Sequence, residues 1–292
     1  MIPLGKAVGI KLFADGALVV SLEGSDTLKV GDLLLKVNDT RVQSTEQLQA
    51  LLQKNGSMPV SMQVRRGERL VTFTDTPQCG SDGVYRLGAW IRDSMAGIGT
   101  VTYYDPATGD FGALGHGITD GDTMALMPFG SGSILPSTVK AVKKGSSGSA
   151  GELRGNFDLS GDLGPLCANT DCGIFGTLPA DCTLAAGEAL PVGDAVEGPA
   201  TIRANVSGDE VREYAVEILK RLPNASDGRE MVISVTDPDL IAATGGIVQG
   251  MSGSPILQNG KLVGAVTHVL LSDATKGYGI SMETMLNAGE NV

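Results

Sequence analysis

Residues 244–269, TGGIVQGMSGSPILQNGKLVGAVTHV, combine a glycine-rich turn with a following strand pattern. The turn, GMSGSP at residues 250–255, places one serine among small residues, and the apolar residues at 261–269 predict a strand. Glycine allows a tight turn in which backbone N–H groups converge on one point. The pattern indicates a nucleophilic serine, Ser252, beside an oxyanion hole formed by the backbone N–H groups of Gly250 and Ser252.

Composition limits the class of protein around this turn. The chain has 292 residues, of which 42% are hydrophobic and only 4% aromatic, and it contains 41 glycines. Many short Val, Ile and Thr runs among glycines predict strands joined by tight turns. The net charge of −11 argues against a nucleic-acid partner, because binding phosphates requires a basic surface. No stretch reaches 18 apolar residues and the start lacks a signal peptide, so we expect a cytoplasmic chain or one whose export segment has been removed.

The four cysteines do not predict a metal centre. Their spacing, Cys79, Cys167, Cys172 and Cys182, differs from that of a zinc ribbon, and only two histidines could contribute ligands. We expect free thiols, with a disulfide or a metal site as the alternatives, and we expect no cofactor.

Two domains are expected, at residues 1–76 and 77–292. In the first, strand patterns at 8–12, 17–22 and 33–37 precede a helix at 45–53, which Ser44 caps together with Gln47. The second alternates short apolar runs with turns and is predicted to be mainly β, as a pair of barrels or packed sheets. Residues 210–222 fit either a helix or a strand.

The first domain resembles a bacterial PDZ domain. The resemblance rests on LGKAVGIKL at residues 4–12, KVGDLLLKVND at 29–39 and VRRG at 64–67. PDZ domains bind a peptide as an added strand. The resemblance places that groove along Val8, Gly9, Ile10 and Lys11; the alternative is that this segment only packs against its neighbour.

The two histidines have different surroundings. His116 lies between two glycines where a strand ends, which suits a general base that faces a cleft. His268 lies within the apolar strand after Ser252, where a core or pocket-wall position is more common than a catalytic one.

The serine turn is similar to the GDSGGP of chymotrypsin-like peptidases. Met251 replaces the aspartate that pairs with a new N-terminus in the animal enzymes, so that mode of activation is not expected here. The serines at 146, 147 and 149 are weaker candidates because no apolar strand follows them. Spacing alone leaves the third, carboxylate member open among Asp120, Asp122, Asp158, Asp162, Asp194, Asp237 and Asp239.

Four longer motifs resemble the stage IV sporulation protein B family of PDZ-containing serine peptidases from spore-forming Firmicutes. They are IRDSMAGIGT at residues 91–100, GALGH at 112–116, GIFGTL at 173–178 and the run from 236 to 269. The resemblance implies a chymotrypsin-like, double-barrel serine peptidase domain after the PDZ domain. It places the catalytic residues at His116, Asp237 and Ser252.

The same resemblance implies a role in sporulation signalling. It implies an endopeptidase that cleaves itself and then a membrane-anchored, extracytoplasmic regulator of an intramembrane metalloprotease, which activates a late mother-cell sigma factor. It places the enzyme in the forespore intermembrane space, with a membrane-anchoring segment absent from this chain. The alternatives are a general quality-control PDZ protease and a PDZ scaffold with an inactive peptidase-like domain.

Overall fold

A computed structural model describes residues 1–158, 160–179, 181–182, 184, 186–222, 225 and 228–290. It divides into two compact units. One contains Met1–Lys11, Ala96–Ile118 and Gly132–Val292, and the other Leu12–Met95 and Thr119–Ser131. Strands β1 (Ile2–Leu22) and β8 (Ala89–Tyr104) each contribute residues to both units. A single boundary at residues 76/77, as expected from the sequence, therefore does not separate the units.

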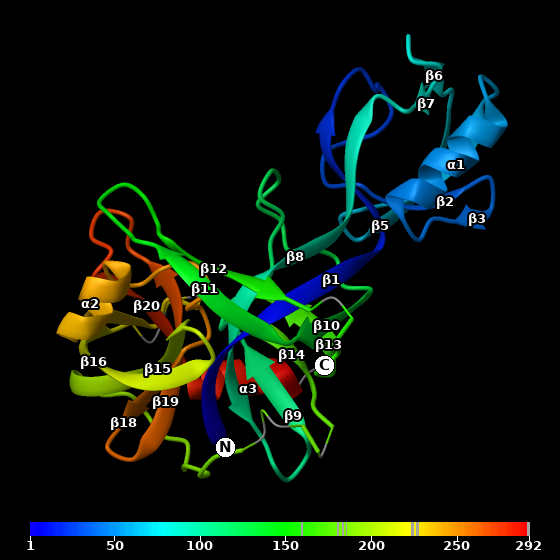
Figure 1. The fold of residues 1–292 in the computed structure, drawn as a ribbon. Helices are drawn as coiled ribbons and strands as arrows, with labels where there is room; N and C mark the ends of the chain where they lie inside the picture. Colours follow the sequence, from blue (N-terminus) through cyan, green and yellow to red (C-terminus); the bar gives the residue numbers. More distant parts are fainter. Residues whose placement is uncertain are drawn as a thin grey trace. The chain divides into compact units, whose positions relative to one another are not determined.

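The second unit contains most of the segment that resembles a PDZ domain, and we call it the PDZ unit. Its sheet has the order β1-β2-β4-β5, with β3 paired to β2. The bounds are β2 (Leu33–Val37), β3 (Thr40–Arg41), α1 (Thr45–Asn55), β4 (Val60–Arg66), β5 (Arg69–Asp75), β6 (Gln78–Cys79) and β7 (Tyr85–Arg86). The core lies between this sheet and α1, which contributes Leu48 and Leu52 (Figure 1).

Local sequence explains where α1 begins. The Ser44 hydroxyl accepts a hydrogen bond from the Gln47 N–H at 3.1 Å, and the Gln47 Oε1 accepts one from the Gln43 N–H at 2.7 Å. The first bond satisfies an N–H group that a helix start leaves without an intrahelical partner, and the second holds the residue before the cap against the first turn. The predicted helix and its cap are confirmed.

Two barrels build the first unit. Strands β10-β13-β14-β9-β8-β1 form a path that closes because β10 also pairs with β1. The second barrel closes in the order β15-β16-β17-β20-β19-β18 (Figure 1). The first barrel's further bounds are β9 (Asp110–Ala113), β10 (Ser131–Leu135), β13 (Gly164–Thr170) and β14 (Gly173–Thr177). The second comprises β15 (Gly198–Ser207), β16 (Glu210–Arg221), β17 (Met231–Val235), β18 (Pro255–Gln258), β19 (Lys261–Val269) and β20 (Lys276–Ser281).

Four elements complete this unit. A two-stranded sheet is formed by β11 (Ser137–Lys143) and β12 (Glu152–Phe157). Helix α2 (Pro238–Thr244) connects β17 to the serine turn, and α3 (Met282–Glu290) follows β20 and buries Met282 and Met285. The predicted architecture, mainly β with a smaller α+β unit and a pair of barrels, is confirmed.

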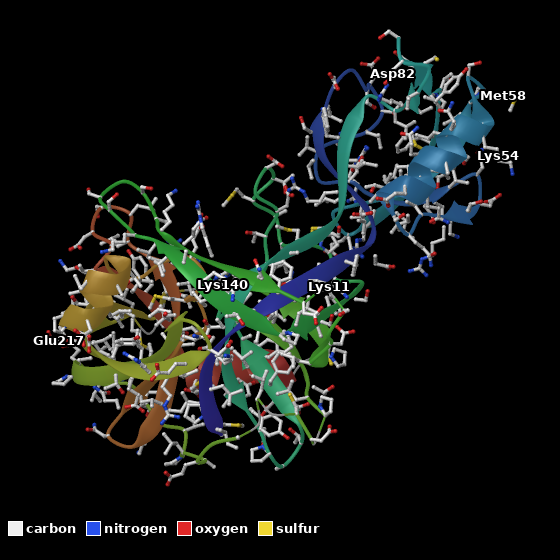
Figure 2. All side chains as sticks on the ribbon, in the orientation of Figure 1. Lys11, Lys54, Met58, Asp82, Lys140 and Glu217 are labelled. Atoms are coloured by element: carbon white, nitrogen blue, oxygen red, sulfur yellow. The ribbon has the colours of Figure 1, made fainter. Side chains whose placement is uncertain are left out.

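The ambiguous segment 210–222 forms strand β16, which ends at Arg221. Tyr214, Val216 and Ile218 are buried at alternating positions, whereas Glu217 lies on the outer face (Figure 2). β16 pairs with β15 on one side and β17 on the other, and these pairings favour the strand period over the helical one.

The predicted peptide groove at Val8, Gly9, Ile10 and Lys11 requires a correction. These residues lie in the two-barrel unit rather than in the PDZ unit, and the first three are buried. A Cβ at Gly9 would lie 2.5 Å from the Cβ of Phe157, so the strand packs tightly there. The segment resembles a PDZ strand locally, but its long-range packing places it in the first barrel.

Candidate active site

Glycine permits the turn that carries Ser252 between α2 and β18. Gly250 and Gly253 both have φ +96°, a region that favours glycine. A Cβ at Gly253 would lie 2.0 Å from the carbonyl oxygen of Thr100 and 2.5 Å from the backbone nitrogen of Leu114. The turn therefore fits against the first barrel only with glycine after the serine.

The Ser252 side chain is half-buried and points to strand β19. Its hydroxyl donates a hydrogen bond to the carbonyl of Thr267 at 2.7 Å. Thr100 holds the turn from the other side, because its N–H donates to the Ser252 carbonyl at 3.0 Å and its hydroxyl to the Gly250 carbonyl at 2.7 Å. The nucleophile candidate is thus fixed between the two barrels of one compact unit.

Some backbone N–H groups of the serine turn donate hydrogen bonds within the protein, and others do not. The Met251 N–H donates to Val248 and the Gly253 N–H to Val266. The N–H groups of Gly250 and Ser252, which were predicted to form the oxyanion hole, donate to no backbone carbonyl within the described part of the chain. These two are therefore the N–H groups of the turn that remain for an oxyanion.

His116 follows β9 through Leu114 and Gly115, which both have φ +70°. The Nδ1 atom of His116 lies 2.8 Å from the carbonyl oxygen of Gly117. This contact favours the tautomer with the proton on Nδ1, which leaves Nε2 as a base. Burial lowers the pKa of His116 below its ordinary 6.5, so the neutral, basic form prevails at neutral pH.

The structure brings the surroundings of His116 and Ser252 together. A Cβ at Gly115 would lie 3.0 Å from the Cγ2 of Thr267, the residue that accepts the Ser252 hydrogen bond. The rings of His116 and His268 have centroids 4.9 Å apart. A neutral histidine and a serine on a glycine turn, in one region, are the groups that acyl transfer needs.

Asp237 has a different set of contacts. Its Oδ1 accepts hydrogen bonds from the N–H groups of Asp239 and Leu240, both at 3.0 Å, and caps α2. Its Oδ2 accepts one from the Ala215 N–H at 3.2 Å. In this conformation the carboxylate is engaged by the backbone of α2 and β16.

Comparison with known families identifies the domains. The family profile described as SpoIVB peptidase S55 matches residues 83–286, and a PDZ domain profile matches residues 27–66. The peptidase match covers more than half of the chain. The chain belongs to the SpoIVB peptidase S55 family. It is a PDZ-containing serine peptidase.

Solved structures with similar folds are distant. The PDZ domain of an SdrC-like protein from Listeria monocytogenes is 17% identical over 26% of this chain and 87% of its own, with a TM-score of 0.25. The active form of the Rv3671c protease from M. tuberculosis is 13% identical over 68% of this chain and 74% of its own, with a TM-score of 0.37. The HtrA-type protease AlgW with a decapeptide is 10% identical over 99% and 64%, with a TM-score of 0.38. A search of curated proteins finds no match.

Several of the other carboxylates considered as third member of the S55 site have partners elsewhere. Asp120 and Asp122 both pair with Arg92 in the PDZ unit. Asp158 accepts from the Ser160 N–H and hydroxyl. Asp162, Asp194 and Asp239 are exposed.

Sequence reasoning did not find two backbone acceptors of the candidate site, the carbonyls of Gly117 and Thr267. No residue type marks a carbonyl, so only the folded strands reveal them. It also missed the cap at Asp237, although an aspartate followed by proline is a common helix start and could have indicated one.

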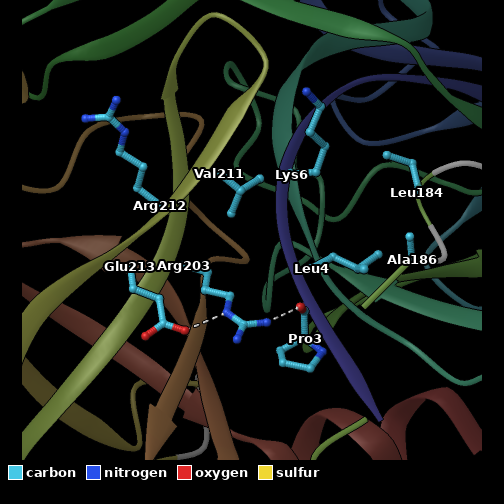
Figure 3. Close-up of a pocket in the computed structure, with 9 residues that line it drawn as sticks. All are labelled: Pro3, Leu4, Lys6, Leu184, Ala186, Arg203, Val211, Arg212 and Glu213. Atoms are coloured by element: carbon cyan, nitrogen blue, oxygen red, sulfur yellow. Dashed lines mark hydrogen bonds and ion pairs between the residues drawn. The ribbon is translucent and has the colours of Figure 1, made fainter. Parts of the chain in front are cut away.

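A surface pocket of about 550 Å³ lies away from these groups. It is lined by residues near β1, β15 and β16, and neither His116 nor Ser252 contributes to it. Figure 3 shows Arg203 at its centre, donating to the carboxylate of Glu213 and to the carbonyl of Pro3 at 3.0 Å. The guanidinium is therefore paired within the protein.

All four cysteines are free thiols. Cys172 is half-buried, and burial raises the pKa of its thiol. In the described ranges, no cluster of three or more His, Cys, Asp or Glu side chains is placed to hold a metal. No helix among the described residues is long and apolar enough to span a membrane.

Proposed function

We propose that the chain is a serine endopeptidase in which Ser252 is the nucleophile, His116 the general base and Asp237 the acid of the triad. The observation that carries the proposal is the placement of Ser252 on the Gly250–Gly253 turn, beside β19 and against the strand end that bears His116. Membership of the S55 family supports the same three residues.

The chemistry follows from the two half-buried side chains. His116, neutral at neutral pH, accepts the Ser252 hydroxyl proton as the serine oxygen attacks a peptide carbonyl. The N–H groups of Gly250 and Ser252 stabilise the oxyanion, each worth about 2.7–4 kcal/mol of transition-state free energy. Water then hydrolyses the acyl-enzyme.

Three hydrogen bonds must change for this reaction. The Ser252 hydroxyl, which donates to Thr267, has to rotate toward His116. The Nδ1 atom of His116 has to leave the carbonyl of Gly117, and the Asp237 carboxylate has to exchange a capping bond for one to that nitrogen. Catalytic hydrogen bonds commonly tighten only when substrate binds. We infer that substrate binding assembles the triad.

The proposed biological role is that of a sporulation signal. The enzyme cleaves itself in the forespore intermembrane space and then cuts a membrane-anchored regulator that silences an intramembrane metalloprotease, which releases the late mother-cell sigma factor. The PDZ domain binds a peptide or C-terminus that steers this substrate or restrains the enzyme. Family resemblance supports this role.

Self-cleavage gives a direct test. Purified chain is incubated and its products are mapped by mass spectrometry. We expect a cut within residues 1–80 that is lost in Ser252→Ala and kept in Ser254→Ala, a matched control whose buried hydroxyl has no hydrogen-bond partner among the described residues.

The alternatives predict other results. Unchanged cleavage in Ser252→Ala would assign the nucleophile elsewhere. Rapid, unselective degradation of an unfolded protein such as casein would favour a quality-control protease, and a chain inert toward every substrate would favour the scaffold.

A further inference from the structure

The edge of β19 beside Ser252 is open where a substrate would lie. β18 pairs with β19 only as far as Pro255 and Ala265. The serine turn occupies the next position, because Val266 accepts from the Gly253 N–H at 2.7 Å and donates to the Ser254 carbonyl at 2.9 Å. From Thr267 to Val269, the pairings given for the described strands involve only β20, on the other edge.

This arrangement fixes the direction of a bound peptide. The Thr267 carbonyl lies 2.7 Å from the Ser252 oxygen. It is therefore within reach of the N–H of the residue whose carbonyl Ser252 attacks, the P1 residue. The preceding substrate residues must continue along Thr267 to Val269, because Val266 is already occupied. The peptide then runs antiparallel to β19, with P1 opposite Thr267 and P2 opposite His268.

His268 thus faces the P2 side chain. Residues directly opposite each other in antiparallel strands have side chains on the same face, about 4.5–5.5 Å apart. The half-buried His268 ring lies 4.9 Å from that of His116, so the P2 side chain would lie against both rings.

The chemistry of this subsite is polar and partly basic. His268 is directly opposite Tyr278 on β20, and the guanidinium of Arg229 lies 5.3 Å from the centre of the Tyr278 ring. The neighbouring Glu230 carboxylate is directed to the junction of β20 and α3, where it accepts from the Ser281 N–H at 2.7 Å and the Thr284 hydroxyl at 2.6 Å. Those bonds also hold the segment that carries Arg229.

We propose that His268, whose strand partner Tyr278 is in contact with Arg229, forms a P2 subsite that selects an acidic substrate side chain. An imidazole N–H donates to a carboxylate, and Arg229 adds positive charge in a chain whose net charge is −11. The proposal rests on the proposed peptidase function and names the substrate class of the same site.

The test uses peptidyl phosphonate probes that differ only at P2, carrying Asp, Asn, Ala or Lys, and a simple fluorophosphonate as reference. The full chain is labelled and rates are compared. We expect the Asp probe to label about 10- to 100-fold faster than the Ala probe, as for hydrogen bonds to a charged group. The Lys probe should be slowest.

Variants assign the preference to residues. His268→Leu should reduce the Asp-to-Ala ratio to within about threefold of one, whereas His268→Gln, which keeps a donor, should retain part of it. Arg229→Gln should lower the Asp-to-Asn ratio selectively. Each variant is judged by the ratio of its labelling rates with two probes. A general loss of reactivity lowers both rates and leaves that ratio unchanged.

The outcomes separate this inference from the proposed function. If the reference probe labels Ser252 but the Lys or Ala probe reacts as fast as the Asp probe, the inference is overturned and the peptidase assignment stands. An Asp preference unchanged in His268→Leu also overturns it. If the reference probe does not label Ser252, the peptidase proposal fails, and the subsite with it.

Discussion

Asp237 has two roles in this account, a helix cap that the structure contains and a triad acid that we propose. Asp237→Ala removes the acceptor for the Asp239 and Leu240 N–H groups and the partner of the Ala215 N–H. Loss of an N-cap costs about 0.5–2 kcal/mol, and loss of a further hydrogen bond costs about 0.5–1.5 kcal/mol. We therefore expect about 2 kcal/mol of destabilisation, or a fall in thermal midpoint of about 4–8 °C for a unit of this size.

Asparagine separates the two roles. Asp237→Asn keeps a good capping oxygen and should lower the midpoint by much less than Asp237→Ala. It removes the charge that would stabilise His116 as an imidazolium, and such a change in a triad lowers kcat by about 10⁴-fold. Asp239→Ala is the matched control, because it removes an exposed charge from the same helical turn without removing the cap.

Thermal unfolding and self-cleavage rates are measured on all three variants. Wild-type stability in Asp237→Ala would refute the capping argument. Self-cleavage of Asp237→Asn within tenfold of wild type would show that Asp237 is not the acid.

Three further predictions follow from the described contacts. Burial lowers the pKa of His116 below 6.5, so its basic form persists as the pH falls. We therefore expect the acid limb of the pH profile of kcat/KM to have its midpoint below pH 6.5. A midpoint above pH 7 would contradict the assignment of His116 as the base. Gly253→Ala should abolish self-cleavage and destabilise the peptidase unit, because its Cβ would lie 2.0 Å from a backbone oxygen. Gly260→Ala is the control for backbone strain alone, because Gly260 has φ +73° and a Cβ there would meet no atom within 4 Å. Equal losses of stability in the two variants would refute the argument from the clash. Asp32→Ala should destabilise the PDZ unit because Arg66 loses its bidentate partner. We expect about 3 kcal/mol, the low end of the range for breaking a buried ion pair, because Arg66 is partly exposed. An unfolding midpoint in urea equal to that of the wild type would contradict this.

Local signals in the sequence predicted local structure well. The Ser44 cap is formed by residues within a few positions of one another, so its pattern was sufficient to place α1. The glycine turn at Ser252 was likewise readable, because positive φ at Gly250 and Gly253 leaves few other choices of residue.

Features that depend on distant pairing were not readable. Residues 8–12 and 17–22 were predicted as two strands, yet they belong to one strand, β1, and the part of it up to Lys11 belongs to the barrel unit. The apolar residues of segment 210–222 fit both the helical repeat and the alternation of a strand. Only the pairing with β15 and β17 decides in favour of the strand.

The site shows the same division. Residue type and spacing indicated Ser252 and His116, whereas the carbonyls that orient them carry no sequence signal. Spacing also left the position of the carboxylate open. The contact of the Asp237 Oδ2 with the Ala215 N–H depends on β16, which precedes Asp237 by some twenty residues and is brought alongside only in the folded barrel.

The nucleophile is the claim on which the rest of this account depends. Fluorophosphonate labelling of the intact chain, followed by peptide mapping, tests it directly. We predict a single modification on the peptide that contains Ser252, absent in Ser252→Ala and present in Ser254→Ala. Modification of Ser146, Ser147 or Ser149, or labelling that persists in Ser252→Ala, would contradict it.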